Sequence, residues 1–152
     1  MEVTLAALAD YAATTDQGKL VVAGVFDTLN ARRLPARHPM MALVLRLQAQ
    51  PHEARSHAVA VRFVGPDGEE VLPELNARLD FPDAGAAERS TAQLVLNMPG
   101  VLLKQPGRHG IDVFVDGVQV ASVPLWVNLV EAAEGHESGP AAPSGPEPPT
   151  IH

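Results

Sequence analysis

The 152-residue sequence contains no cysteine. This absence excludes disulfide bonds, thiolate ligands for a metal and a cysteine nucleophile. Aromatic residues are also scarce, at 4 % of the chain, although 46 % of the residues are hydrophobic. The core must therefore consist mainly of valine, leucine and alanine, and few aromatic rings are left to form a platform for a ligand.

Positive charge is outnumbered by negative charge. The chain has 11 lysines and arginines against 18 aspartates and glutamates, which gives a net charge of −7. A general nucleic-acid-binding protein needs clustered positive charge to neutralise phosphates, so this balance argues against that class. Long apolar runs are missing as well, since none approaches the ~20 residues that span a bilayer.

The N-terminus is apolar but differs from a secretory signal. Such a signal has a cationic region before its apolar core, whereas this chain has Glu2 before its first apolar residues and Asp10 after them. We therefore expect a cytoplasmic protein with no membrane partner and no nucleic-acid partner.

Short β-like segments recur along residues 1–130. They are rich in valine and leucine and are separated by turns of glycine, proline and aspartate, and no segment favours a helix. The pattern predicts one all-β domain, an immunoglobulin-like antiparallel β-sandwich of about eight strands. The expected strands are residues 2–9, 19–28, 40–48, 56–64, 69–81, 89–98, 107–115 and 118–127.

The last two of these strands meet at Asp116-Gly117 and form the clearest hairpin in the sequence. Asp-Gly suits a two-residue type I′ turn, because both central residues need a positive φ. Ile111, Val113 and Val115 are expected on one apolar face of this hairpin.

The sequence also predicts the position or local structure of three other segments. Residues 19–28 are apolar with little alternation, which favours the centre of a sheet covered on both faces. Residues 29–39 contain two prolines, which disfavour regular structure and push the chain toward extended geometry. Pro99-Gly100 is expected to end the strand over residues 89–98.

The composition changes at Glu131. Residues 131–152 are rich in glycine, proline, alanine and serine, contain four glutamates and have no lysine or arginine. They cannot bury enough apolar surface to offset their ordering entropy, which predicts a disordered acidic tail. Without this tail, residues 1–130 keep 14 acidic and 11 basic residues, a net charge of −3.

Two groups of motifs resemble an uncharacterised family of short bacterial proteins, a domain of unknown function. The first group is Leu8-Ala9-Asp10-Tyr11-Ala12, Gly18-Lys19-Leu20 and Gly24-Val25-Phe26-Asp27. The second group is Pro106-Gly107-Arg108, Val113-Phe114-Val115-Asp116-Gly117 and Val123-Pro124-Leu125. The second group is also similar to the final hairpin of many immunoglobulin-like sandwiches. The resemblance covers about residues 5–127 and implies a fold but no activity.

The residues that could bind metals or catalyse reactions do not form a known metal-binding or catalytic motif. His52 and His57 are five residues apart, which suits neither one strand face nor one helical turn, and His38 and His109 are isolated. A zinc site needs three or four converging ligands, so we predict no metal at the histidines. Calcium at the loop ends stays open, because several aspartates lie near turns; these are Asp10, Asp16, Asp27, Asp67, Asp112 and Asp116.

No serine lies in a Gly-x-Ser-x-Gly elbow, and no glycine-rich phosphate-binding loop is present. The sequence therefore predicts no catalytic residue and no cofactor.

Arg32, Arg33 and Arg37 form the only basic cluster in the sequence. Guanidinium groups recognise carboxylates and phosphates through paired hydrogen bonds, which makes this cluster a candidate partner or anion contact. A solvated loop is the other interpretation. The glutamates of the tail could also dock here, weakly, because an exposed ion pair contributes ~0–1 kcal/mol.

The leading hypothesis is a non-enzymatic protein-interaction module that binds an unidentified protein or associates with itself through an open sheet edge. A small-molecule or carbohydrate-binding module is the first alternative. A hydrolase with a site of unrecognised type is the second.

Overall fold

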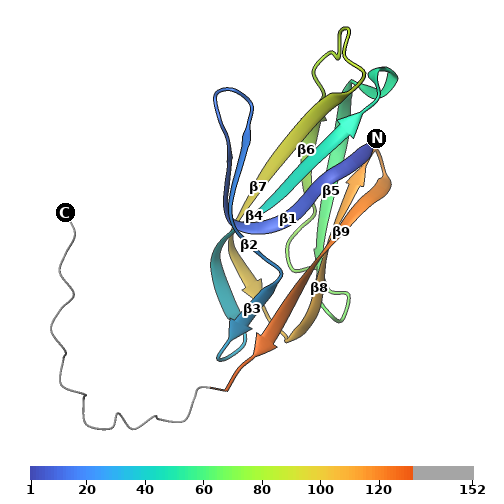
Figure 1. Cartoon of the computed structure of the whole chain (residues 1–152). Helices are drawn as coiled ribbons and strands as arrows, with labels where there is room; N and C mark the ends of the chain where they lie inside the picture. Colours follow the sequence, from blue (N-terminus) through green and yellow to red (C-terminus); the bar gives the residue numbers. More distant parts are fainter. Residues whose placement is uncertain (132–152) are drawn as a thin grey trace, which may run out of the picture.

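Nine strands run through residues 1–131, the part of the chain that the computed structural model describes (Figure 1). The pattern predicted about eight. The strands are β1 (Glu2–Thr14), β2 (Leu20–Phe26), β3 (Thr28–Ala31), β4 (Ala36–Ala49), β5 (Ser56–Val64), β6 (Leu75–Asp80), β7 (Ser90–Leu103), β8 (Gly107–Val115) and β9 (Val118–Leu129). One turn of 3₁₀ helix, η1 (Pro51–Glu53), joins β4 to β5.

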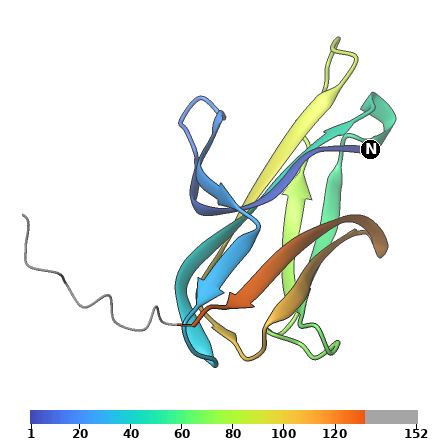
Figure 2. The same ribbon diagram turned by 60° about the horizontal axis from the view of Figure 1, so that its bottom comes forward.

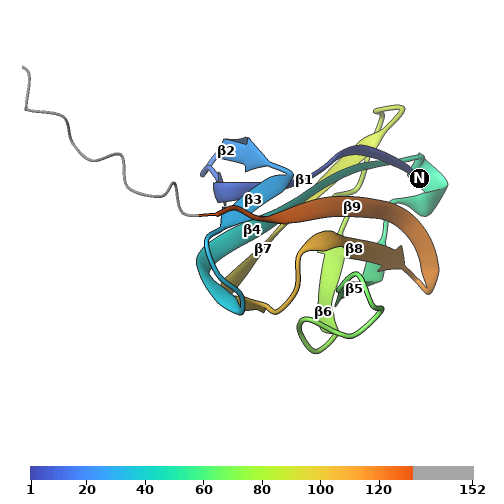
Figure 3. The same ribbon diagram turned by 90° about the horizontal axis from the view of Figure 1, so that it is seen from below.

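The strands form two sheets, as expected for an all-β protein. The first sheet has the order β2-β1-β4-β7 and the second has the order β3-β9-β8-β5-β6. All neighbours are antiparallel except β3 and β9, which are parallel. Figures 2 and 3 show the two sheets facing each other across the core.

Strand β4 shows how the sequence builds this core. Its leucines alternate with other residues, so that Leu43, Leu45 and Leu47 face the second sheet while Arg46 and Gln48 face away, as the alternation predicts. The second sheet contributes valines and isoleucine from β5, β8 and β9, together with the buried ring of Phe63. Each fully buried leucine contributes about 1.5–3 kcal/mol relative to an exposed one.

The predicted closing hairpin is confirmed. Strands β8 and β9 meet at Asp116 and Gly117, whose φ angles are 48° and 82°, as a type I′ turn requires. Ile111, Val113 and Val115 are all buried.

The predicted central position of residues 19–28 is wrong. Strand β2 lies at the edge of the first sheet, and β1 is the only strand within residues 1–131 that pairs with it. Val21 and Val25 are exposed, so the apolar run in this strand does not reflect burial on both faces.

Two other expectations about local structure differ from the structure. Residues 29–39 are largely extended, as expected, but they are more regular than expected, because β3 and the start of β4 occupy most of them. Pro99-Gly100 does not end β7, which continues to Leu103. Gly100 adopts a φ of 60°, and the chain resumes its pairing with β4 immediately afterwards.

The β1–β2 hairpin extends beyond the rest of the first sheet. Strand β4 pairs with β1 as far as Ala9, and beyond that residue β1 pairs with β2 alone. The hairpin lies against the outer face of the sheet, where Leu20 and Val22 pack beside Val44. The Gln93 side-chain amide of β7 fastens its tip by donating to the Gly18 carbonyl at 2.6 Å.

No helix within residues 1–131 has the length and apolar character needed to cross a membrane. The predicted acidic tail, residues 131–152, lies outside the described residues apart from Glu131.

Candidate functional site

The three arginines singled out in the sequence lie around one cleft. Strand β3 ends at Ala31 in the second sheet, and β4 begins at Ala36 in the first, so the segment between them passes from one sheet to the other. A cleft of about 410 Å³ lies beside this segment and is lined by Arg32, Arg33 and Arg37. We call it the arginine cleft.

The arginines of the cleft form no ion pair with an acidic residue within residues 1–131. All three are exposed, and no aspartate or glutamate from this part of the chain lines the cleft. Arg37 is held in place, because its Nη1 donates a hydrogen bond to the Gly100 carbonyl at 2.6 Å. An anion entering the cleft would therefore meet guanidinium groups that no carboxylate already occupies.

Two further polar side chains line the arginine cleft and were not predicted. Asn30 reaches it from β3, and His38 reaches it from β4. His38 also lies against Phe26, with ring centroids 5.9 Å apart. Their proximity to the arginines along the sequence is the only signal that could have suggested them.

The last strand, β9, ends beside β3 (Figure 1), and Leu29, Asn30 and Ala31 of β3 line the cleft. Leu129 of β9 pairs with Ala31, and the Val130 N–H donates to the Ala31 carbonyl at 2.8 Å. The chain beyond β9 therefore starts next to the arginines.

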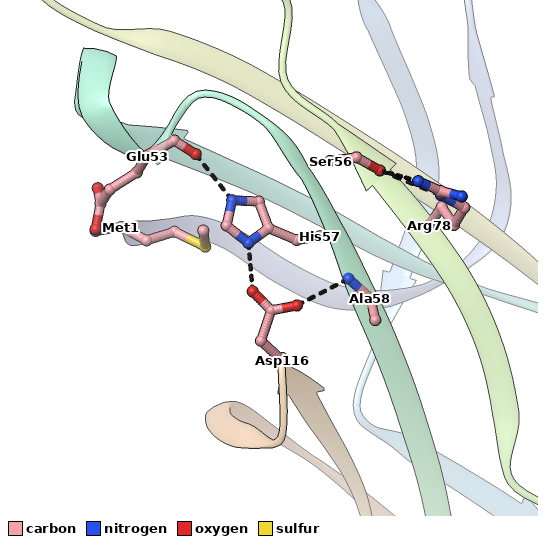
Figure 4. Close-up of polar contacts among 7 residues, drawn as sticks. All are labelled: Met1, Glu53, Ser56, His57, Ala58, Arg78 and Asp116. Atoms are coloured by element: carbon pink, nitrogen blue, oxygen red, sulfur yellow. Dashed lines mark hydrogen bonds and ion pairs between the residues drawn. The ribbon is translucent and has the colours of Figure 1, made fainter.

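A second polar cluster surrounds the buried side chain of His57 (Figure 4). The His57 Nδ1 lies 2.6 Å from Asp116 Oδ2, and its Nε2 lies 2.8 Å from the Glu53 carbonyl oxygen. Both partners are acceptors, so both ring nitrogens must carry a proton to donate to them. The geometry therefore selects the imidazolium form of His57.

The ionisation of this cluster agrees with its geometry. The Glu53 carbonyl raises the pKa of His57, the Asp116 carboxylate adds to that effect, and burial opposes it. The hydrogen bond from His57 lowers the pKa of Asp116, and the Ala58 N–H lowers it further. The N-terminal amino group lies 2.8 Å from the Glu53 carboxylate and lowers the pKa of Glu53.

The His57 cluster is arranged as a clamp. Neither nitrogen of His57 is available to accept a proton from a substrate. Ser56 points to the other side of β5 and its Oγ accepts hydrogen bonds from Arg78, so Ser56 and His57 do not form a nucleophile–base pair (Figure 4). The cluster instead ties the β8–β9 turn to β5 and η1. Asp116 and His57 are 59 residues apart, and their contact has no signal in the sequence.

The aspartates considered for calcium do not converge. Residues 1–131 contain no group of three histidine, cysteine, aspartate or glutamate residues placed to hold a metal ion. Asp67 instead closes its own turn. Its Oδ1 accepts the Glu69 N–H at 3.1 Å and its Oδ2 accepts the Gln105 amide at 2.6 Å, and its pKa is lowered by these bonds.

Two of the aromatic side chains are exposed. Tyr11 of β1 is 59 % exposed and Trp126 of β9 is 46 % exposed. They belong to different sheets, and neither lines the arginine cleft.

These features define a class, an all-β protein of two facing sheets with a basic cleft beside the end of its last strand. The chain belongs to a family of unknown function, DUF6941, which matches residues 4–128. This confirms the resemblance drawn from residues 5–127. No curated protein matches the chain.

Among solved structures, the chain is similar to the Pseudomonas fluorescens alkylpurine DNA glycosylase AlkC bound to DNA containing an abasic site analog. The similarity covers 81 % of this chain and 30 % of that chain, with 15 % sequence identity and a TM-score of 0.40. The chain thus spans less than a third of that structure, and a similarity at this level carries no argument about function.

Proposed function

We propose that this chain is a non-enzymatic protein-interaction module that binds an acidic segment of a partner protein in the arginine cleft. The observation that supports the proposal is the gathering of Arg32, Arg33 and Arg37 around one cleft, whose lining contains no acidic residue among residues 1–131. Carboxylates are the side chains that guanidinium groups bind best in pairs of parallel hydrogen bonds.

The rest of the lining favours a peptide over a small inorganic anion. Leu29, Leu103 and Val127 add apolar surface next to the arginines. A segment that places acidic and apolar side chains side by side would contact both parts of the cleft. Its affinity would come mainly from the apolar contacts, while the arginines would set its orientation and its charge preference.

The strand order supports the finer description of the fold, an immunoglobulin-like β-sandwich. The first sheet contains the order β1-β4-β7 and the second contains the order β9-β8-β5, which match the orders A-B-E and G-F-C in immunoglobulin domains. Strand β2 is an addition at the edge. The fold itself assigns no activity, so the proposed function depends on the cleft.

The test uses a pair of matched double variants in the full chain. A fluorescein-labelled peptide of alternating glutamate and leucine is titrated with the wild type and followed by fluorescence anisotropy. R32A/R33A removes two arginines of the cleft. R55A/R108A removes two other exposed arginines that, like Arg32 and Arg33, form no side-chain hydrogen bond within residues 1–131.

We expect R32A/R33A to weaken peptide binding about tenfold and R55A/R108A to leave it nearly unchanged. Binding should also weaken as sodium chloride rises from about 50 to about 500 mM, because salt screens exposed charges. Equal losses in the two variants, or binding insensitive to salt, would show that the cleft is not the recognition site.

A cytoplasmic location remains a prediction from the sequence, and fractionation of cells that express the chain at its natural level tests it.

A further inference from the structure

Strand β2 is an edge strand with fewer of the features that usually keep edges from pairing. Such edges are protected by charged side chains, proline, kinks or short length. Strand β3 has only four residues, β6 carries Arg78 and Asp80, and β7 contains Pro99 and the kink at Gly100. Strand β2 has the sequence Leu-Val-Val-Ala-Gly-Val-Phe with no charge and no proline, and its one kink is at Gly24, whose φ is 71°.

The outward-facing backbone groups of β2 can be assigned from its pairing with β1. The Thr15 N–H donates to the Lys19 carbonyl at 2.8 Å, so these two residues form a hydrogen-bonded pair. Such pairs alternate with non-hydrogen-bonded pairs along an antiparallel ladder. The backbone N–H and C=O groups of the odd-numbered residues of β2 therefore face β1. Those of the even-numbered residues face the free edge; these residues are Leu20, Val22, Gly24 and Phe26.

One face of β2 is apolar and exposed beside this free edge. Val25 is 65 % exposed and Val21 is 45 % exposed. On the neighbouring strand β1, Tyr11 is 59 % exposed and lies opposite Ala23 of β2. The strand thus offers unpaired backbone groups and an apolar face together, which a second strand could cover at once.

The charges at the two ends of β2 indicate that the partner strand is β2 of a second copy of the same chain. Lys19 precedes the strand, Asp27 follows it, and both are exposed and lack an ion pair within residues 1–131. They are equally distant from Ala23. An antiparallel partner related by a two-fold axis at Ala23 would place Lys19 opposite Asp27 of the other copy, at both ends of the pair.

The same register also gives hydrogen-bond partners to the backbone groups at the free edge. With the axis at Ala23, Val22 lies opposite Gly24 of the other copy and Leu20 lies opposite Phe26. These are the residues whose backbone groups face the free edge. Val21 then lies opposite Val25, as a non-hydrogen-bonded pair whose side chains approach closely.

We infer that β2 pairs with β2 of a second copy of this chain, antiparallel about Ala23, and joins the β1–β2 hairpins of the two chains. The inference is independent of the arginine cleft, which lies beside β3 and β4. The two-fold arrangement makes every contact occur twice, so a single substitution removes two contacts.

Sedimentation velocity of the full chain over a range of concentrations tests the inference. The wild type should reach twice the mass of one chain. V25E should raise the dissociation constant of the dimer about tenfold or more. V118E is the matched control, because Val118 is 66 % exposed at the β8–β9 turn and lies outside the inferred interface; this variant should dimerise as the wild type does.

A charge exchange tests the register itself. K19E places a second carboxylate opposite Asp27 at both ends of the pair and should weaken the dimer. The double variant K19E/D27K restores opposite charges and should recover most of the lost affinity. A wild type that stays monomeric, a dimer that V25E does not weaken, or a double variant weaker than K19E would each overturn the inferred pairing. Circular dichroism checks that every variant is folded.

Discussion

Replacing His57 by leucine tests the clamp between the β8–β9 turn and η1. The substitution removes the hydrogen bonds to Asp116 at 2.6 Å and to the Glu53 carbonyl at 2.8 Å. A hydrogen bond of a charged group contributes about 1.5–3 kcal/mol, and burial of the leucine returns part of the loss. We therefore expect His57→Leu to lower the free energy of unfolding by about 2–4 kcal/mol at pH 6.

The effect must depend on pH with a definite sign. The pKa of His57 is raised above its ordinary value of 6.5, so its contribution is fully present below pH 6.5 and is lost as the pH rises through the raised value. The pKa of Asp116 is lowered from 3.8, so its contribution is lost as the pH falls below 3.8. The difference between the wild type and the variant should therefore be greatest between pH 3.8 and 6.5.

Urea unfolding followed by the fluorescence of Trp126, the only tryptophan, measures both effects. His52→Gln is the control, because it removes an exposed histidine of η1 that belongs to no hydrogen bond of the clamp. It should leave the stability and its pH dependence nearly unchanged. The reasoning fails if His57→Leu unfolds like the wild type at pH 6, or if the two proteins lose stability in parallel from pH 6.5 upward.

Three other outcomes follow from the packing and the backbone. Leu43→Ala, at a side chain that is fully buried between the sheets, should cost about 3 kcal/mol in urea unfolding, and a cost below about 1 kcal/mol would contradict the described core. Gly117→Ala should cost about 1–2 kcal/mol because its φ is 82°, although a Cβ there would meet no atom within 4 Å. Gly24→Ala should cost more, since its φ is 71° and its Cβ would also overlap the Asp10 carboxylate, with Cγ at 2.9 Å. Adding Asp10→Ala to Gly24→Ala should recover the stability lost through the clash but not the stability lost through the positive φ. Equal losses of stability in Gly24→Ala and Gly117→Ala would refute the clash.

The parts of the fold that follow from local patterns could be predicted from the sequence. The alternating leucines of β4 indicate which face is buried, because successive side chains of a strand point to opposite faces. Asp116-Gly117 indicates a tight turn, because few residues tolerate a positive φ.

The position of β2 could not be predicted in the same way. An apolar run indicates burial only if another layer covers it, and in β2 no other layer covers Val21 and Val25. The sheet order that leaves them exposed depends on pairings between distant residues.

The two polar sites also differ in whether local sequence or long-range pairing brings their residues together. Arg32, Arg33 and Arg37 are close together in the sequence, so a shared location could be expected, and the structure places them around one cleft. The His57 clamp joins residues 59 apart, and each of them has an ordinary local explanation, a strand residue and a turn residue. Only the pairing of β5 with β8 brings them together.

Affinity capture from a lysate of the source cells shows directly whether the arginine cleft binds a partner protein. Immobilised wild type, R32A/R33A and R55A/R108A are compared at low and moderate salt. We expect one protein with an acidic segment that the wild type and R55A/R108A retain and R32A/R33A loses. Retention of the same proteins by all three forms, or of none by the wild type, would contradict this expectation.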